Sequence, residues 1–227
     1  MMERQRIVIF GVGSGAEMAR RHFTADTLHE ISGHIVDREH LTERTFGGLP
    51  VVIVDEATAR FPPERYLAFV LLGASEMNSV RIKKYQLLKS LGYQFISFIH
   101  SSNRIASAKF GENCFVLENQ SINLDVVVGN NVVIWSGCQI GDRTKIEDNV
   151  FMASHVVLAG DSLIGESSYL GINCAVANGV KLGKRCFVGA NALIASDTNE
   201  GAVHVVEPTP PLGIDSRRFA KMIRHPI

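Results

Sequence analysis

The chain contains 227 residues, of which 46% are hydrophobic, enough to build the core of one large domain or of two modest ones. Lysine plus arginine and aspartate plus glutamate both total 23, so the formal net charge is zero, which argues against broad electrostatic capture of nucleic acid or of an anionic membrane. The apolar run at 7–10 is too short for a signal peptide, and the run at 66–73 is too short to span a bilayer. We therefore expect a cytoplasmic protein with no segment inserted in a membrane.

The first hundred residues alternate between strand-like and helix-like patterns. This alternation predicts a parallel, doubly wound, Rossmann-like sheet. The second helix carries apolar residues at helical spacing, namely Val80, Leu87, Leu88 and Leu91. Strands are expected at 6–10, 30–37, 49–55, 66–73 and 93–99, and helices at 16–23 and 77–92.

A glycine-rich turn follows the first strand, and such a turn can present backbone N–H groups to a phosphate at a helix N-terminus. Its third glycine comes one residue too early for the dinucleotide fingerprint GxGxxG, so we expect a nucleotide sugar rather than NAD. Asp37 is placed to accept hydrogen bonds from a ribose or base, and Arg38 to bind a phosphate. A tight turn without a ligand remains an open alternative. The candidate nucleotide-sugar-binding residues are Gly11, Gly13, Ser14, Gly15, Asp37 and Arg38.

From Phe110 onwards the pattern changes to a six-residue repeat. Every sixth residue up to Ile194 is apolar, fifteen positions in succession, and the residue four places after each of them is small, except at Gln120. A period of six fits a coil of three short strands, one on each side of a triangular prism, with about five coils of eighteen residues. The apolar residues are Phe110, Val116, Ile122, Val128, Ile134, Ile140, Ile146, Met152, Leu158, Ile164, Leu170, Val176, Leu182, Val188 and Ile194.

The four cysteines all occupy the small position of the repeat, which points into the prism. They show no CxxC spacing, so we expect compact core residues, with no disulfide scaffold and no metal site. They are Cys114, Cys138, Cys174 and Cys186.

Three segments carry a resemblance to a known family: GVGSGAE after the first strand, residues 77–102 at the junction, and FMASHVVLAGDSLIGESSYLGINCAV at 151–176. Over nearly its whole length the chain resembles the hexapeptide-repeat acyltransferases that act as sialic acid O-acetyltransferases or nucleotide-amino-sugar N-acetyltransferases. The resemblance implies a left-handed parallel β-helix, a homotrimer, and acetyl-CoA as acyl donor in a groove between neighbouring prisms. It also implies that the α/β half holds the nucleotide, and it assigns acetyl-CoA contacts to Gly160, Ile172, Asn173 and Ala190.

The general base is the point at which this sequence departs from the family. The family usually carries a histidine in the hexad that here reads IGDRTK, where this chain has Asp142. A general base contributes about 10²–10⁴-fold in rate, so three interpretations remain open. Asp142 acts as base or as counter-ion of the amine, or His155 acts as base, or the protein supplies no base, in which case proximity alone drives attack by an amine or the protein has lost activity. We rank His155 first, because counting by eighteen places it between Gly137 and Asn173 in an outward column, although it can equally be a wall or interface residue.

The leading hypothesis is an acetyl-CoA-dependent acetyltransferase that acts on a nucleotide-linked amino sugar in the synthesis of a surface glycan. The alternatives are O-acetylation of a sialic acid or another sugar, and a catalytically silent trimer that binds a nucleotide sugar. The domains are expected at 1–100 (Rossmann-like) and 101–207 (β-helix), and a segment at 208–227 is expected to cover the open end of the coil. Asp215 or Ser216 is expected to cap a short helix in that segment.

Overall fold

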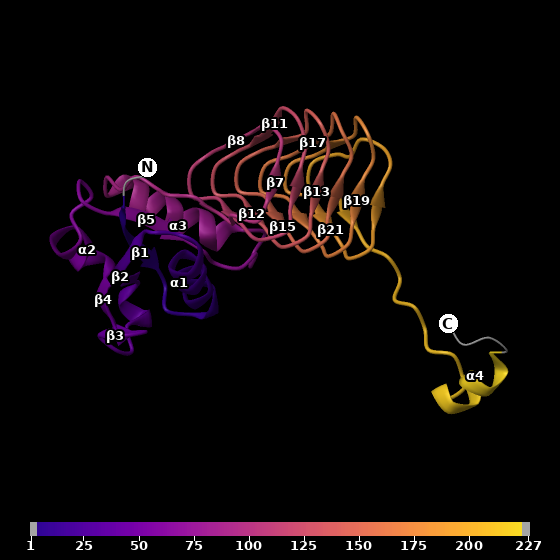
Figure 1. Ribbon diagram of the computed structural model, residues 1–227, viewed down its shortest axis with the longest axis horizontal. Coiled ribbons are helices and arrows are strands. Elements are labelled where there is room, and N and C mark those ends of the chain that lie inside the picture. The colour runs from indigo at the N-terminus through magenta and orange to yellow at the C-terminus, as the bar shows by residue number, and fades with distance from the viewer. Residues whose placement is uncertain (1–3, 224–227) are drawn as a thin grey trace.

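The structure is a computed structural model that describes residues 4–223. It consists of an α/β domain followed by a long coil of short strands, and a C-terminal tail that ends in a separate helix (Figure 1). Both the Rossmann-like sheet and the left-handed parallel β-helix predicted from the sequence are present. Among the described residues, no helix is long and apolar enough to cross a membrane.

The α/β domain is built on a five-stranded sheet in the order β3-β4-β2-β1-β5, in which only β3 is antiparallel. Strand β1, which lies between β2 and β5, contributes Ile7, Val8 and Ile9, which are fully buried, as expected for a parallel sheet covered on both faces. The strands are β1 (Arg6–Phe10), β2 (Glu30–Val36), β3 (Thr45–Phe46), β4 (Leu49–Ile53) and β5 (Leu67–Val70), and the helices are α1 (Ser14–Asp26), a 3₁₀ turn (Arg38–His40), α2 (Val54–Arg60) and α3 (Ser79–Ser90).

Two predicted strands differ from the structure. The run at 49–55 ends as a strand at Ile53, and helix α2 begins at the next residue, with Asp55 and Glu56 in its first turn, where the helix dipole favours acidic side chains. The run at 93–99 is not a strand of the Rossmann-like sheet. Phe95 makes one isolated bridge to β5, and Phe98–Ile99 forms β6, the first strand of the coil.

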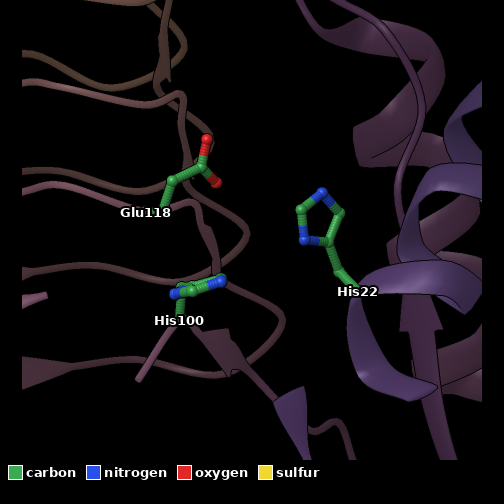
Figure 2. A group of neighbouring side chains, drawn as sticks. All are labelled: His22, His100 and Glu118. Atoms are coloured by element: carbon green, nitrogen blue, oxygen red, sulfur yellow. The ribbon is translucent and has the colours of Figure 1, made fainter. Parts of the chain in front are cut away.

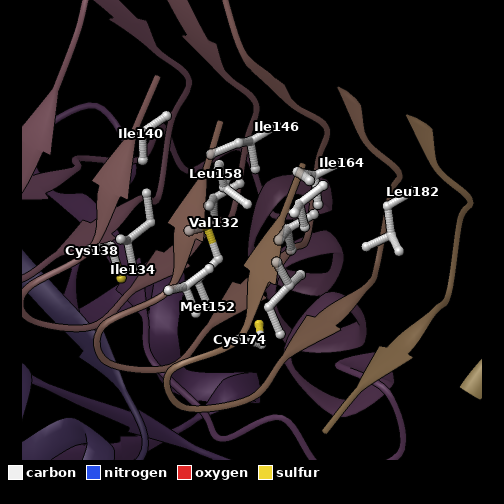
Figure 3. Packing of buried hydrophobic residues seen from close by; sticks show 14 of the residues in the cluster. Val132, Ile134, Cys138, Ile140, Ile146, Met152, Leu158, Ile164, Cys174 and Leu182 are labelled. Carbon is white, nitrogen blue, oxygen red and sulfur yellow. The ribbon is translucent and has the colours of Figure 1, made fainter. Parts of the chain in front are cut away.

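The coil has three parallel sheets, of seven, six and five strands, that form the sides of the prism. Of the fifteen predicted apolar residues, all but the half-buried Phe110 are buried in one continuous core (Figure 3). The first sheet contains β6 (Phe98–Ile99), β9 (Phe115–Val116), β12 (Val133–Ile134), β15 (Phe151–Met152), β18 (Tyr169–Leu170), β21 (Phe187–Val188) and β23 (Val203–His204). The second contains β7 (Arg104–Ile105), β10 (Ser121–Ile122), β13 (Gln139–Ile140), β16 (Val157–Leu158), β19 (Ala175–Val176) and β22 (Leu193–Ile194), and the third contains β8 (Ala108–Phe110), β11 (Val126–Val128), β14 (Lys145–Ile146), β17 (Leu163–Ile164) and β20 (Lys181–Leu182).

The six-residue count missed the start of the coil. Ile105 pairs with Ile122, seventeen residues later, whereas Phe110 pairs with Val128, eighteen residues later. One step of five residues therefore breaks the count just before Phe110. Gln120, the exception to the small positions, is buried, and its amide bonds to the carbonyls of Leu117 and Trp135 and to the backbone of Cys138. Because the amide is hydrogen-bonded, it can replace a small apolar side chain in the core.

The corners of the prism are columns of residues with left-handed backbone, one column between each pair of sheets. Asparagine and glycine are frequent there, because they enter the left-handed region at less cost than other residues. The first corner contains Asn119, Gly137, His155, Asn173 and Asn191, the second contains Asp125, Arg143, Asp161 and Gly179, and the third contains Asn113, Asn131, Asn149, Ser167 and Arg185.

The third corner joins the coil to the α/β domain. Asn113 donates to and accepts from the backbone of Val70 at the end of β5, and its amide also donates to Asn131 at 2.8 Å. Arg81, on α3, is fully buried and donates to backbone carbonyls of the coil, with its shortest bond to Asn149 at 3.0 Å. The buried face of α3 is therefore Arg81, Tyr85 and Leu88, which shares only Leu88 with the predicted apolar stripe.

Among the described residues, the C-terminal segment does not cover the coil, whereas the sequence predicts a covering segment at 208–227, of which residues 224–227 lie outside the described part. It runs away from the last strands, and α4 (Ser216–Met222) lies apart with no buried residue (Figure 1). Residues 205–213 are all exposed, because the prolines and polar residues there no longer supply inward-pointing anchors. The predicted cap is confirmed: the carboxylate of Asp215 accepts a hydrogen bond from the backbone of Arg218 at 2.9 Å. The domain boundaries given above remain predictions.

Candidate functional site

The glycine turn lies at the carboxyl edge of the sheet, next to the switch point between β1 and β5. Gly11 has φ +100° and donates its N–H to Ile35, so its conformation is part of the turn. A Cβ on Gly15 would lie 2.4 Å from the carbonyl oxygen of Leu71, so this glycine lets α1 approach β5. A Cβ on Gly13 would meet nothing within 4 Å. Two of the three glycines are therefore explained by the fold, and only Gly13 leaves open space beside Ser14.

Asp37 and Arg38 lie at the end of β2, at the same edge of the sheet as the glycine turn. The carboxylate of Asp37 accepts from Lys84 of α3 at 2.7 Å, and Arg38 pairs with the exposed Asp55 at 2.7 Å. A ribose or base that bonded Asp37 would share the carboxylate with Lys84. Lys84 is a cation near Asp37 that sequence reasoning missed, because no phosphate-binding motif includes it.

His34 contacts the glycine turn through a hydrogen bond, and the sequence analysis did not identify it. Its Nδ1 lies 2.9 Å from the carbonyl oxygen of Gly11, while its Nε2 is buried without a partner among the described residues. Burial lowers the pKa of this histidine, so the ring is neutral near pH 7. It donates from Nδ1 and stabilises the glycine turn without adding charge.

His155 occupies the first corner, as the eighteen-residue count predicts. Its φ is +60°, its side chain is exposed, and its ring lies directly over Gly137, where a Cβ would come within 2.6 Å of Cε1. Glycine at position 137 therefore makes room for the imidazole. Further along the same corner, Asn173 donates to Asn191 at 2.7 Å.

The predicted acetyl-CoA contacts divide between two corners. Ile172, Asn173 and Ala190 are exposed on or beside the first corner, together with His155. Gly160 lies beside the second corner. A Cβ added to it would lie 3.2 Å from the carbonyl oxygen of Asp142. The width of one strand segment, about 15 Å, separates these groups within a single chain.

The side chain of Asp142 has a hydrogen-bond partner, whereas that of His155 has none among residues 4–223. Its Oδ1 accepts a hydrogen bond from the backbone N–H of Leu124 in the preceding coil, at 3.0 Å. Asp148 makes the same kind of bond to the backbone of Asn130, and Asp197 to that of Lys181. Asp142 thus belongs to a recurring set of carboxylates that bind successive coils together, and the structure does not bring it next to His155.

The four cysteines are buried as predicted and have no disulfide partner. Burial raises the pKa of the Cys114 and Cys138 thiols to about 11 and that of Cys174 to about 12. These thiols stay protonated near pH 7 and are not candidate nucleophiles.

Comparison with known proteins supports the description of the coil. Residues 125–160 and 161–196 match the bacterial transferase hexapeptide family, which is described by six repeats. Comparison with curated proteins finds no match.

Several solved structures share the fold of the whole chain. A perosamine N-acetyltransferase mutant from Caulobacter crescentus, in complex with CoA and GDP-perosamine, has a TM-score of 0.77 at 23% identity, and the match covers 89% of this chain and 93% of that one. The acetyltransferase domain of PglB from Neisseria gonorrhoeae, in complex with acetyl coenzyme A, has a TM-score of 0.78 at 20% identity and covers 92% and 100%. Residues 125–196 are therefore bacterial transferase hexapeptide repeats, and the chain has the same α/β-plus-coil fold as these acetyltransferase structures.

Proposed function

We propose that the protein transfers an acetyl group from acetyl-CoA to the amino group of a nucleotide-linked amino sugar, as a step in the synthesis of a surface glycan. The observation that carries the proposal is the combination, in one chain, of an open glycine turn at a sheet edge with a hexapeptide coil. The same fold, over 89% of the chain, occurs in a structure that holds both CoA and GDP-perosamine.

In this reaction the sugar nitrogen attacks the thioester carbonyl, the C–N bond forms, the C–S bond breaks, and CoA leaves as the thiol. The nitrogen must lose a proton, and a nearby imidazole is suited to accept it near neutral pH. We assign this role to His155, because its ring is exposed and has room above Gly137. The carboxylate of Asp142 is already bonded to the backbone of Leu124, which favours a structural role.

The active form is proposed to be a homotrimer with the donor in a groove between two prisms. The exposed apolar side chains of Val157, Ile172 and Leu193, which are 40%, 51% and 67% exposed, lie on or beside the second sheet and the first corner. Exposed apolar residues that lie together on one side of a protein are typical of an interface. In such an assembly Gly160 of one chain can face Ile172 of a neighbour, which would reunite the divided set of contacts.

The test of the catalytic assignment is a pair of substitutions, His155→Ala and Asp142→Asn, assayed by release of free CoA with a nucleotide-linked amino sugar as acceptor. We expect His155→Ala to lower kcat by about 10²–10⁴-fold, and Asp142→Asn to change it less than tenfold. Near-full activity in His155→Ala would show that the assignment is wrong. If the unsubstituted protein releases no CoA with any acceptor, the catalytically silent trimer becomes the better description.

The acceptor class is tested separately, by thermal-shift measurements with UDP-, GDP- and dTDP-linked sugars and with free sialic acid. Stabilisation by one nucleotide sugar supports the proposal, since a ligand that binds only the folded state raises the melting temperature. Stabilisation by the free sugar alone would instead support O-acetylation of a sialic acid. Light scattering of the full-length protein tests the trimer, whose expected mass is three times 24.9 kDa.

A further inference from the structure

A second group of titratable side chains lies at the joint between the two domains, away from both candidate sites described above. His22 projects from α1, His100 follows β6, and Glu118 follows β9 on the next coil, and the three side chains face one another (Figure 2). All three are partly buried. One potential ligand atom of each lies within 4.8 Å of those of the other two. Glu118 is two coil steps, about 10 Å, from His155 along the prism.

Glu118 has one carboxylate oxygen that is bonded and one that is not. Oε1 accepts a hydrogen bond from the hydroxyl of Ser136 at 2.7 Å. Oε2 is buried and has no hydrogen-bond partner among the described residues. A buried carboxylate oxygen without a partner is costly unless a cation or a proton donor reaches it. The geometry of Glu118 therefore points to a ligand between it and the two imidazoles.

Asp26 supplies a second carboxylate behind His100. It accepts hydrogen bonds from the backbone and the hydroxyl of Ser101, and its Oδ2 lies 4.0 Å from Nδ1 of His100. Nδ1 of His100 lies 3.2 Å from the backbone nitrogen of Ser102 and 3.0 Å from its hydroxyl, so Nε2 is the nitrogen left to face the ligand. Metal binding through Nε2 requires the tautomer that donates from Nδ1 to the hydroxyl of Ser102.

The charges of the group are consistent with a bound cation. Among residues 4–223 neither Glu118 nor Asp26 forms an ion pair with a lysine or an arginine.

We propose that His22, His100 and Glu118 bind a divalent transition-metal ion of the zinc class, which ties helix α1 to the first coils of the β-helix. Two imidazoles and one carboxylate suit Zn²⁺, whereas Ca²⁺ and Mg²⁺ prefer oxygen ligands alone. Tetrahedral Zn²⁺ places its ligand atoms about 3.3 Å apart, so side-chain rotations close the present separations. Solvent would fill the fourth position.

A second group with the same ligand types, Asp37, Glu39 and His40, is a poorer site. Glu39 and His40 are exposed, and Asp37 already pairs with the ammonium of Lys84 at 2.7 Å, which would repel a metal ion. His40 therefore provides a matched control, since it is another histidine in a group of three potential ligands.

The proposal revises the expectation of no metal, which rested on the cysteines. The three ligands come from segments 78 and 18 residues apart (22 to 100, and 100 to 118), so no local spacing motif marks them.

The test measures metal binding by the full-length protein after treatment with a chelator and dialysis. Zn²⁺ is titrated in competition with a chromophoric chelator, and Co²⁺ is added as a spectroscopic probe. We expect about one ion per chain, a Co²⁺ spectrum of a four-coordinate site, and a higher melting temperature with Zn²⁺. Glu118→Gln and His22→Ala should weaken Zn²⁺ binding by about 100-fold, and His40→Ala should leave it unchanged.

The variants also separate loss of the site from loss of the fold. Glu118→Gln preserves shape, so its melting temperature without metal should match that of the unsubstituted protein, while the increase on adding Zn²⁺ disappears. No binding by the unsubstituted protein would overturn the proposal, and so would binding that survives both Glu118→Gln and His22→Ala or that is lost in His40→Ala. None of these measurements depends on acetyl transfer, so the metal site and the proposed activity can fail independently.

Discussion

The coil and the α/β domain build their cores in different ways. In the coil, the neighbours of a buried residue are its counterparts about eighteen residues earlier and later, so each inward position repeats the same contact. In the α/β domain, the core joins distant segments, as in the edge-on contact of Phe23 with Phe69. Counting residues thus predicts the first core but not the second. Neither rule predicts the surface where the two domains meet.

That difference explains how much of the fold could be predicted. The six-residue count identified the coil residue by residue, and alternation of patterns identified the sheet. The count failed before Phe110, where one step is five residues long. The apolar stripe predicted for α3 was wrong at Arg81, because the helix there faces backbone carbonyls of the coil instead of an apolar surface. A buried arginine has no periodic signature, because its partners in the coil lie 50 to 69 residues away in the chain.

In the candidate site, the sequence predicted the position of residues in the repeat but not their side-chain hydrogen bonds. Counting by eighteen placed His155 correctly in the column of Gly137 and Asn173. It did not reveal that Asp142 is held by the backbone of Leu124, or that Asp37 is shared with Lys84, because these bonds depend on side-chain geometry. The group of His22, His100 and Glu118 was not predictable at all, since it requires the docking of α1 against the coil.

The largest stability effect is expected at the joint itself. Arg81→Ala removes hydrogen bonds to several buried carbonyls and leaves a cavity, so we expect the free energy of unfolding to fall by about 3–5 kcal/mol. Burial lowers the pKa of Arg81 to about 9, so the guanidinium stays charged at pH 7 and the effect should be flat between pH 6 and 8. Urea unfolding followed by circular dichroism measures the change.

Two further variants identify the cause of that effect. Lys83→Ala, on the exposed side of the same helix, should shift stability by no more than about 0.5 kcal/mol. Arg81→Lys keeps the charge but loses the planar guanidinium, so its loss of stability should lie between those of Arg81→Ala and Lys83→Ala. If Arg81→Ala were as stable as Lys83→Ala, the buried arginine would not hold the domains together.

The glycine turn provides an intermediate effect within the α/β domain. Gly15→Ala pushes a Cβ against the backbone carbonyl of Leu71 and should cost about 1–3 kcal/mol, measured by thermal or urea unfolding. Gly13→Ala meets open space and has φ −87°, so its cost should be nearer 0.5 kcal/mol. If the turn binds a phosphate, Gly13→Ala should nevertheless abolish most of the thermal shift caused by a nucleotide sugar. Equal shifts in Gly13→Ala and in the unsubstituted protein would favour the turn without a ligand.

The smallest effect tests the corners of the coil, where backbone conformation rather than packing selects the residue. Asn119 is exposed, has φ +62° and sits at the start of the first corner. Asn119→Ala should cost about 1 kcal/mol, because alanine enters the left-handed region less readily than asparagine, while Asn119→Gly should be within about 0.5 kcal/mol of the unsubstituted protein. In a helix or strand interior the order would be reversed, with alanine preferred over glycine. An alanine variant more stable than the glycine variant in urea unfolding would therefore mean that the corner relaxes out of its left-handed conformation, and that the coil is less rigidly periodic than its core.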